Sequence, residues 1–437
     1  MEPVLLRARG VPESQAINTY LAAGGWQGFT KALGMTPDEV TKLVLDSELR
    51  GRGGAGFPTG RKWSFIPKDH PGPRYLICNA DESEPGTFKD RELIEYDPQM
   101  VIEGVAIASY AIKANTAYVY IRGEFVRWAR ILEKAVEEAR SRGFLGKDIQ
   151  GSGYDLDIWV HRGAGAYICG EETALIESLE GKRGFPRLKP PFPAVVGVFG
   201  KPTVVNNVET LACVPHIMTR GAAWFASIGR PKNTGPKLFC VSGHVNRPGV
   251  YELPLGVTFK EIIYEHCGGI RGGRALKAFF PGGSSAPIMT AGEVDVRADF
   301  DACAEAGTML GSGGIIVLDD RVDIVEAAAN IAHFYAHESC GQCTPCREGS
   351  DWCMDILDRI AAGHGRTGDP DTLLRICRFA SQGMTICPLG DAFALPITSL
   401  VKKFGPEFED RIRSASPTPQ KKLPVLPWAG PRPGFGS

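Results

Sequence analysis

The sequence predicts a multidomain α/β protein with three folded parts: a Rossmann-like parallel-sheet domain, a smaller α+β module and a C-terminal helical bundle. Two observations carry this prediction. Apolar runs alternate with amphipathic helical patterns between residues 75 and 179, which is typical of parallel strands joined by helices. The last hundred residues show helical periodicity, interrupted by a turn that contains three cysteines. Because 437 residues exceed one hydrophobic core, about two to four domains are expected.

Composition argues against several classes of function. Hydrophobic residues make up 43% of the chain and charged residues 23%, and the net charge of -1 gives no reason to expect nucleic acid as a partner. No apolar run approaches the roughly 18 residues of a membrane span, and Met1–Arg7 lacks the apolar core of a signal peptide. We therefore expect a cytoplasmic chain without direct membrane insertion, whose twelve cysteines stay reduced.

A glycine-rich segment, residues 51–60, follows a helical lead-in that is expected over residues 1 to about 50 and contains a helix start at Thr36. Gly51, Gly53 and Gly56 match the G-x-G-x-x-G spacing, but the dinucleotide fingerprint requires a preceding strand, so we reject that interpretation. Four glycines in six residues still let backbone N–H groups approach a phosphate closely. Four cations accompany them: Arg50, Arg52, Arg61 and Lys62. The alternative is a flexible surface loop.

The parallel sheet is predicted from strands at 75–78, 117–121 and 155–160 and helices at 99–114, 126–142 and 172–179. Each strand runs into an unusual loop. The first loop is polar and acidic, the second reads Arg-Gly-Glu and the third is rich in glycine: 79–86, 122–124 and 163–173. Because ligands bind beyond the carboxyl ends of parallel strands, the three loops together predict a ligand-binding edge. Taken singly, each loop is also explained without a ligand, as a turn after a buried strand or as close packing of a strand against a helix.

The segment beyond residue 182 is rich in proline, with prolines at 186, 190, 191 and 193. This composition is incompatible with an ordinary helix or a central strand, so we expect the segment to wrap over the sheet edge. Asn206 and Asn207 follow it. Their amides have two interpretations, as caps of the next helix or as contacts to a heterocyclic ring.

The rest of the chain predicts two further parts. Strands at 237–241, 250–253 and 314–318 around a helix at 259–266 indicate a small α+β module. Its Cys240, Cys267 and Cys303 are interpreted as buried hydrophobic residues. Helices are then expected at 323–338, 347–361, 370–382 and 390–413. We place the domains at 1–60, 61–232, 233–320, 321–415 and, for an extended Pro-rich tail, 416–437.

Cys340, Cys343 and Cys346 lie at two-residue intervals, and Cys387 directly precedes a proline. This pattern is typical of the ligands of an iron–sulfur cluster. Zinc is the main alternative, although structural zinc sites usually join two separate Cys hairpins. Two other residues, Cys353 and Cys377, are possible substitutes for the fourth ligand.

A cluster accepts one electron at a time, whereas a nicotinamide donates a hydride that carries two. A protein that joins the two needs an intermediary able to do both, and flavin is the common one. A flavin would give the glycine-rich and acidic loops of the sheet edge a purpose.

With these motifs in hand, residues 15–410 resemble the NADH-binding flavoprotein subunits of NADH:quinone oxidoreductase, respiratory complex I. Five motifs in the family's order carry the resemblance: Gly51–Gly60 with Lys62, Asn79–Gly86, Gly163–Thr173, Asn206–Thr210, and Cys340–Gly349 with Cys387 and Pro388. The resemblance implies a β-grasp module at 233–320 and a cluster-bearing helical bundle after it.

The resemblance also implies which residues bind the cofactors. FMN would contact Gly51, Arg52, Gly53, Lys62, Asn79, Asp81, Glu82, Ser83, Tyr167, Gly170, Glu171, Asn206 and Asn207. NADH would contact Gly53, Gly54, Phe57, Lys62, Phe65, Glu84, Glu172 and Phe192, with Glu172 positioning the nicotinamide. One [4Fe-4S] cluster would be held by Cys340, Cys343, Cys346 and Cys387.

The implied activity is oxidation of NADH by hydride transfer to FMN, followed by single-electron transfer to the cluster and onward to quinone. No catalytic acid or base is expected, because hydride transfer needs positioning rather than proton transfer. The implied partners are a thioredoxin-like [2Fe-2S] subunit and a large multi-cluster iron–sulfur subunit, at the cytoplasmic face of a bacterial inner membrane. The alternatives are the flavoprotein subunit of an NAD-linked hydrogenase or formate dehydrogenase, and a zinc-bearing structural subunit.

Overall fold

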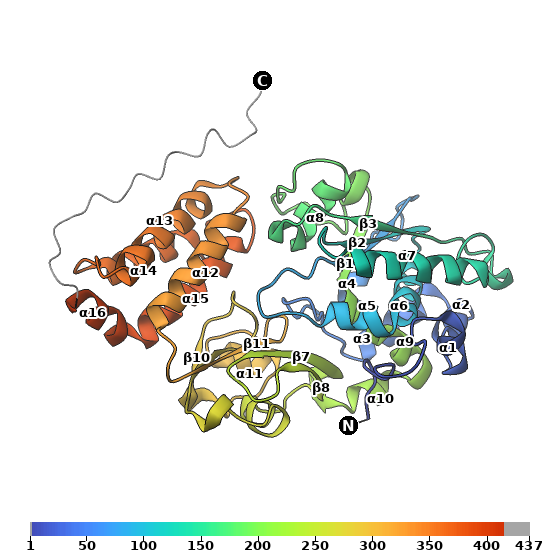
Figure 1. Cartoon of the computed structure of the whole chain (residues 1–437). Coiled ribbons are helices and arrows are strands. Elements are labelled where there is room, and N and C mark those ends of the chain that lie inside the picture. Colours follow the sequence, from blue (N-terminus) through green and yellow to red (C-terminus); the bar gives the residue numbers. More distant parts are fainter. Residues whose placement is uncertain (1, 415–437) are drawn as a thin grey trace.

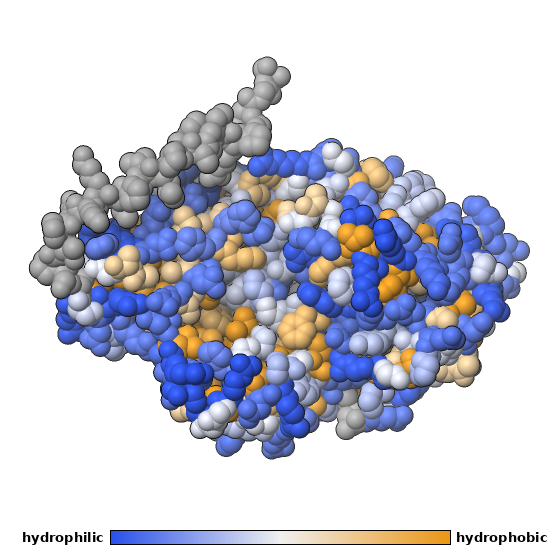
Figure 2. All heavy atoms as spheres, viewed as in Figure 1, coloured by the Kyte–Doolittle hydropathy of each residue, from blue (hydrophilic) through white to orange (hydrophobic). Residues whose placement is uncertain are grey.

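The computed structural model describes residues 2–414, so the predicted Pro-rich tail lies outside the described residues. Figure 1 shows three parts: an α/β domain, a smaller mixed-sheet module below it and a bundle of helices beside both. In the space-filling view, apolar and weakly polar residues gather along the seam between the bundle and the α/β domain (Figure 2). None of the helices in the described residues is long and apolar enough to cross a membrane.

The chain begins with three short helices, α1 (Ile17–Ala22), α2 (Gln27–Leu33) and α3 (Pro37–Asp46). The predicted start of α3 is confirmed. Thr36 and Glu39 form a capping box, with Thr36 accepting from the Glu39 N–H and Glu39 accepting from the Thr36 N–H. The chain then passes through the glycine-rich loop into α4 (Thr59–Trp63), so this loop does follow a helix.

The first domain is built on a four-stranded parallel sheet in the order β3-β2-β1-β4. The three predicted strands are confirmed as β1 (Tyr75–Ala80), β2 (Thr116–Ile121) and β3 (Asp157–Arg162). The fourth strand, β4 (Thr203–Asn207), was not predicted. The Pro-rich segment thus ends by joining the sheet as an edge strand. Its prolines all precede the residues that pair with β1, so the N–H groups needed for strand pairing are present.

Helices cover both faces of this sheet. The predicted helices are confirmed as α6 (Pro98–Ala111), α7 (Val126–Ser141) and α8 (Glu172–Leu179), and α5 (Asp90–Tyr96) and α9 (Val208–Arg220) join them. Side chains of β1 alternate between the two cores. Leu76 and Cys78 pack among α6, α7 and α9, whereas Ile77 faces α8 and a core that is continuous with the helical bundle.

One short helix and two short strands lead into the second module: α10 (Ala222–Ala226), β5 (Gly229–Arg230) and β6 (Asn233–Thr234). The module has a five-stranded mixed sheet in the order β10-β9-β11-β7-β8, in which β7 and β11 run parallel. The expected strands are β7 (Pro236–Gly243), β8 (Gly249–Pro254) and β11 (Gly314–Asp319). The sequence missed β9 (Leu276–Phe280), β10 (Met289–Thr290) and α11 (Phe300–Glu305). The expected helix is a single π-helical segment, η4 (Glu261–His266), and the three cysteines of the module are buried.

Five helices form the C-terminal bundle: α12 (Ile324–Glu338), α13 (Thr344–Ala361), α14 (Asp369–Ala380), α15 (Leu389–Lys403) and α16 (Gly405–Arg413). The single helix predicted at 390–413 is wrong. The chain breaks at Phe404, where φ is -122°, and a new helix begins with a proline in its first turn. α13 also starts earlier than predicted, since Pro345 sits in its first turn as well.

Candidate functional site

A cavity of about 440 Å³ lies where all three parts meet, at the carboxyl edge of the parallel sheet. Its volume is in the usual range of small-molecule sites. The glycine-rich loop, the loops after β1 and β3, two loops of the mixed-sheet module and the start of α15 all contribute to its wall. From the predicted sites it takes Gly53, Gly54, Asn79, Asp81, Glu82, Ser83, Glu84, Tyr167, Gly170, Glu171, Asn207 and Cys387.

The glycine-rich loop is a closed turn that hydrogen bonds hold in place. The N–H of Gly51 donates to the carbonyl of Phe57 at 2.8 Å, and Arg50 Nε donates to the carbonyl of Gly56 at 2.7 Å. At Gly53 a Cβ atom would come within 2.9 Å of the Asn207 Cβ, so only glycine lets the loop lie this close to the sheet. These bonds favour a binding loop over the alternative of a flexible surface loop.

The cations beside the loop are mostly engaged elsewhere. Arg50 pairs with Asp301 at 2.8 Å. Arg52 is fully buried and donates Nη2 to the carbonyl of Thr234 at 2.6 Å, and neither guanidinium lines the cavity. These two side chains therefore do not place positive charge at the cavity, contrary to the prediction that four cations surround the glycine-rich loop.

The loop after β1 is pinned by its own polar side chains. Asn79 donates to the carbonyl of Gly170 at 2.9 Å and accepts from the N–H of Asp81 at 3.0 Å. Ser83 donates to Asp81 at 2.8 Å. Burial raises the pKa of Asp81 to about 7, because the charged form of this carboxyl is poorly solvated there.

Glu84 connects the cavity to the mixed-sheet module. Its carboxylate accepts from the hydroxyl of Tyr167 at 2.7 Å and from the N–H of Ser285 at 2.8 Å. Burial raises the pKa of Glu84. Tyr167 in turn donates its backbone N–H to Glu338 at 3.0 Å, only two residues before Cys340.

The start of α8 carries an ion cluster. Glu172 pairs with Lys62 and with Lys189, both at 2.8 Å, and Lys189 also reaches Glu171 at 2.9 Å. Burial alone would raise the pKa of Glu172, but the ammonium groups of Lys62 and Lys189 outweigh it and lower the pKa to about 2. Sequence reasoning missed Lys189, whose only signal was a basic residue among prolines.

The three phenylalanines of the predicted site are exposed. Phe57 and Phe65 lie with ring centroids 5.9 Å apart, and both keep more than two fifths of their surface accessible. Phe192 is 57% exposed on the Pro-rich segment. Asn206 differs from the prediction, because its side chain accepts from Trp63 Nε1 at 2.8 Å and does not line the cavity.

The cysteine turn lies between α12 and α13, and Cys387 stands just before α15. Burial raises the pKa of Cys346 and of Cys387 to about 12, and the nearby thiols of Cys340 and, for Cys346, Cys343 add to the rise. Each of the four thiols therefore lies within electrostatic reach of at least two of the others. A bound metal centre would supply the positive charge that stabilises their thiolate forms.

The two substitute ligands considered from the sequence lie together elsewhere. Cys353 and Cys377 are buried between α13 and α14, with their Sγ atoms 4.0 Å apart. Within residues 2–414, no three His, Cys, Asp or Glu side chains are arranged around a point where a single ion would bind.

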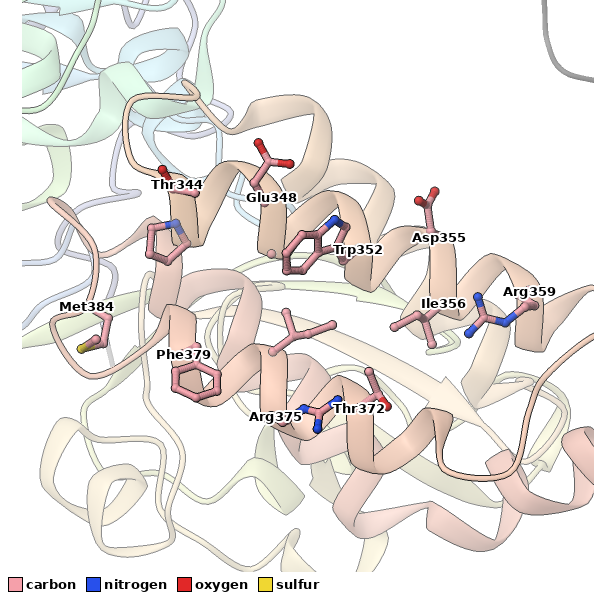
Figure 3. A pocket seen from close by; sticks show the side chains of 13 residues that line it. Thr344, Glu348, Trp352, Asp355, Ile356, Arg359, Thr372, Arg375, Phe379 and Met384 are labelled. Carbon is pink, nitrogen blue, oxygen red and sulfur yellow. The ribbon is translucent and has the colours of Figure 1, made fainter.

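A larger hollow of about 740 Å³ lies between α13 and α14 (Figure 3). Trp352, Phe379 and Met384 line it, and each is more than half exposed. Figure 3 shows Glu348 and Asp355 along the α13 rim. None of the sequence-predicted site residues lines this groove.

Comparison with known proteins defines the class of this chain. The family described as Nuo51 FMN-binding domain matches residues 44–216, and the SLBB domain matches residues 238–288. The NADH-ubiquinone oxidoreductase-F iron-sulfur binding region matches residues 326–411. Fold and site therefore define a flavoprotein that also carries an iron–sulfur region.

The relatives are more specific. One of the F subunits of NADH-quinone oxidoreductase from Rhizobium meliloti is 57% identical over 93% of this chain and 97% of its own length. The F subunit of the same enzyme from Rickettsia bellii is 52% identical over 92% and 96%. The chain belongs to the family of NADH-quinone oxidoreductase F subunits.

Among solved structures, the NAD⁺-reducing [NiFe]-hydrogenase in its H2-reduced state matches with a TM-score of 0.83 and 37% identity. The match covers 96% of this chain and 67% of that one. The same hydrogenase in its air-oxidised state matches with a TM-score of 0.81 and 36% identity, over 97% of this chain and 68% of that one. The fold predicted from the sequence is confirmed.

Proposed function

We propose that this chain oxidises NADH at the cavity and delivers the electrons singly to the cysteine turn. The observation that carries the proposal is the wall of the cavity, which contains both the glycine-rich loop and Cys387. FMN, when bound, accepts a hydride and releases electrons one at a time, and a [4Fe-4S] cluster accepts them singly.

The residues of the cavity suit FMN. Gly54 leaves open space for a phosphate beside the backbone, while Asn79, Asp81 and Ser83 offer a fixed set of polar groups. Tyr167, Gly170, Glu171, Glu82 and Asn207 complete the wall. Arg52 acts indirectly, because its N–H donates to Thr210 at 2.8 Å and thereby fixes the loop.

NADH binding is assigned to the exposed groups beside the cavity. Phe57, Phe65 and Phe192 provide aromatic faces for an adenine ring. Glu172 and Lys62 hold each other in place and offer an acceptor and a donor to the nicotinamide end. Lys189 joins them as a further donor, and Glu84, which the N–H of Ser285 holds from the mixed-sheet module, faces them from the loop after β1.

The cluster is assigned to Cys340, Cys343, Cys346 and Cys387. Three of them come from one turn and the fourth precedes a proline, as iron–sulfur ligands do. Ser339 lies 3.2 Å from the Cys346 sulfur, so its hydroxyl can donate to that ligand.

The chain acts as one subunit of a larger complex, as the name of its relatives implies. The proposed partners are a thioredoxin-like [2Fe-2S] subunit and a multi-cluster iron–sulfur subunit, which carry electrons towards quinone. The proposed location is the cytoplasmic face of a bacterial inner membrane. The domain limits predicted from the sequence belong to the same proposal.

A second candidate is the flavoprotein subunit of an NAD-linked hydrogenase, favoured by the structural match to such an enzyme. Sequence identity of 57% to a quinone-linked relative against 37% to that hydrogenase favours the first candidate. Co-purification of the native complex followed by mass spectrometry distinguishes them.

The test is the anaerobically purified protein. Its visible spectrum should show flavin bands over the broad absorbance of a cluster, and NADH should drive reduction of ferricyanide. Stoichiometric zinc without iron or FMN would instead establish the structural alternative.

A further inference from the structure

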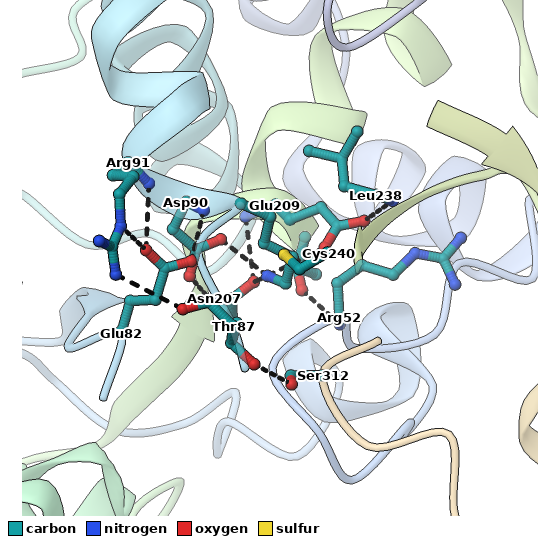
Figure 4. A network of polar contacts seen from close by, with 12 residues as sticks. Arg52, Glu82, Thr87, Asp90, Arg91, Asn207, Glu209, Leu238, Cys240 and Ser312 are labelled. Carbon is teal, nitrogen blue, oxygen red and sulfur yellow. Dashed lines mark hydrogen bonds and ion pairs between the residues drawn. The ribbon is translucent and has the colours of Figure 1, made fainter. Parts of the chain in front are cut away.

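Behind the cavity lies a buried network of charged side chains that reaches into the mixed-sheet module (Figure 4). It joins the loop after β1, the first turn of α9 and the first residues of β7. Lys237, at the start of β7, is completely buried and is not one of the predicted site residues. A buried lysine is rare unless it is paired, so its contacts indicate its role.

Lys237 is bound to Glu209. Its Nζ lies 2.8 Å from a Glu209 carboxylate oxygen and donates to the carbonyl of Leu238 at 2.6 Å. The other Glu209 oxygen accepts from the N–H of Leu238 at 2.8 Å. Glu209 therefore clamps the start of β7 to the start of α9.

Glu209 also holds a second lysine, which belongs to the cavity. Lys89 Nζ lies 2.9 Å from Glu209, 2.7 Å from Asp90 and 3.2 Å from the side-chain oxygen of Asn207. Lys89, Asp90 and Asn207 all line the cavity. Asn207 donates to Asp90 at 2.6 Å, and its Cβ is the atom that limits the approach of Gly53.

Lys237 and Lys89 oppose Glu209 and Asp90, and burial leaves no solvent to compensate for a missing member of these pairs. The neighbouring carboxylate of Glu82 is paired separately, with Arg91 at 2.9 Å. Although burial alone would raise the pKa of Glu209, Lys237 and Lys89 lower it, so the carboxylate is charged. Removing Lys237 would leave Glu209 with Lys89 as its nearest lysine.

We propose that Lys237 is a positioning residue of the cofactor site. Because Lys237 shares the Glu209 carboxylate with Lys89, it limits the attraction of Glu209 for Lys89, and Lys89 keeps its contacts with Asp90 and Asn207 beside the glycine-rich loop. The mixed-sheet module thereby shapes the pocket from behind, in addition to the two loops that it contributes to the wall. The inference rests on the proposed function, because the pocket is the one assigned to FMN.

Two variants of the full-length chain test the proposal through the FMN dissociation constant, measured by the fluorescence of released FMN. Lys237→Met should weaken FMN binding roughly tenfold to a hundredfold, since one member of a buried charge set is lost. Lys237→Met combined with Glu209→Gln should recover most of that affinity, because no carboxylate then draws Lys89 away from Asn207. The KM for NADH of flavin-loaded Lys237→Met should stay unchanged.

The matched control is Lys277→Met, which removes a lysine of the same module that pairs with Glu407 at 2.8 Å. It should leave FMN affinity unchanged. Wild-type affinity in folded Lys237→Met, or a double variant that loses as much affinity as the single one, would overturn the proposal. If Lys237→Met does not fold, the FMN affinity of the double variant tests the proposal: affinity close to that of the wild type supports it, and a loss of tenfold or more overturns it. A wild-type chain that binds no FMN would refute the proposed function itself, which is a different result.

Discussion

The two hollows of this protein differ in size and in what forms them. The groove between α13 and α14 is the larger, about 740 Å³ against 440 Å³, but it is built mainly by two neighbouring helices, and apolar side chains provide most of its exposed lining. The smaller cavity collects segments from residue 53 to residue 395, from all three parts of the fold. Convergence of distant, chemically diverse segments, rather than volume, marks the site.

Each hollow is also associated with a set of cysteines. Cys387 lines the cavity and lies within electrostatic reach of Cys340 and Cys346. Cys353 and Cys377 lie in the bundle interior between the two helices that form the groove. The cysteines beside the cavity are therefore suited to bind a cluster, whereas Cys353 and Cys377 fill the interface between two helices.

The largest effect should come from exchanging one cysteine of each set. Cys387→Ser should abolish or strongly alter the cluster signal in electron paramagnetic resonance, while NADH still reduces the flavin. Cys353→Ser should leave that signal intact and change only thermal stability. A normal cluster in Cys387→Ser would break the comparison and point to Cys353 or Cys377 as a ligand.

Acid should weaken the cavity side of the fold through Glu172. Its pKa is about 2 in the folded protein, below the usual value of 4.5, so its stabilising contribution is present above pH 4.5 and is lost as the pH falls towards 2. The loss amounts to at most about 3 kcal/mol. Between pH 5 and pH 3, the urea midpoint should therefore fall more steeply in the wild type than in Glu172→Gln. If the urea midpoints of the wild type and of Glu172→Gln fall equally with pH, the low pKa of Glu172 is contradicted.

The same substitution should impair NADH binding at neutral pH. Glu172→Gln removes a charge-assisted acceptor, so the KM for NADH should rise about tenfold while FMN is retained. Glu177→Gln is a suitable control, because Glu177 lies on the same helix but pairs with Arg187. Equal effects of the two substitutions on KM would remove Glu172 from the site.

A smaller effect is expected from the glycine-rich loop. Gly53→Ala places a Cβ atom 2.9 Å from that of Asn207, so loop and strand must separate and FMN affinity should fall several-fold. Gly51→Ala meets only the carbonyl of Phe57, at 3.4 Å, and should bind FMN more tightly than Gly53→Ala. Reversal of that order, measured by FMN fluorescence, would place the cofactor elsewhere.

The smallest effect belongs to the groove. Trp352→Ala removes a side chain that is 54% exposed, so FMN content, cluster signal and ferricyanide reduction should all match the wild type within error. Loss of FMN in this variant would show that the larger hollow contributes to the site after all.

Much of this arrangement was predictable from the sequence. Periodicity identified three of the four parallel strands, and the edge rule for parallel sheets correctly brought the loops after β1 and β3 together. β4 was missed because prolines before residue 203 masked a short edge strand. The break at Phe404 was missed because the apolar pattern continues across it.

Partner choice among charged side chains was harder to foresee. Arg52 appeared to be a phosphate ligand, yet it is buried against Thr234, whereas Lys189 and Lys237 had no recognisable pattern. Such pairings depend on contacts between residues far apart in the chain, 182 positions for Arg52 and Thr234, and no local signal encodes them.

Rapid mixing of the holoprotein with NADH under anaerobic conditions tests the central claim most directly. Flavin absorbance and the cluster signal are followed in the same reaction by stopped flow and freeze quenching. We predict that the flavin absorbance bleaches first and that the cluster signal rises as a later phase. A flavin that is reduced while the cluster stays oxidised would contradict the claim that the cavity joins the two.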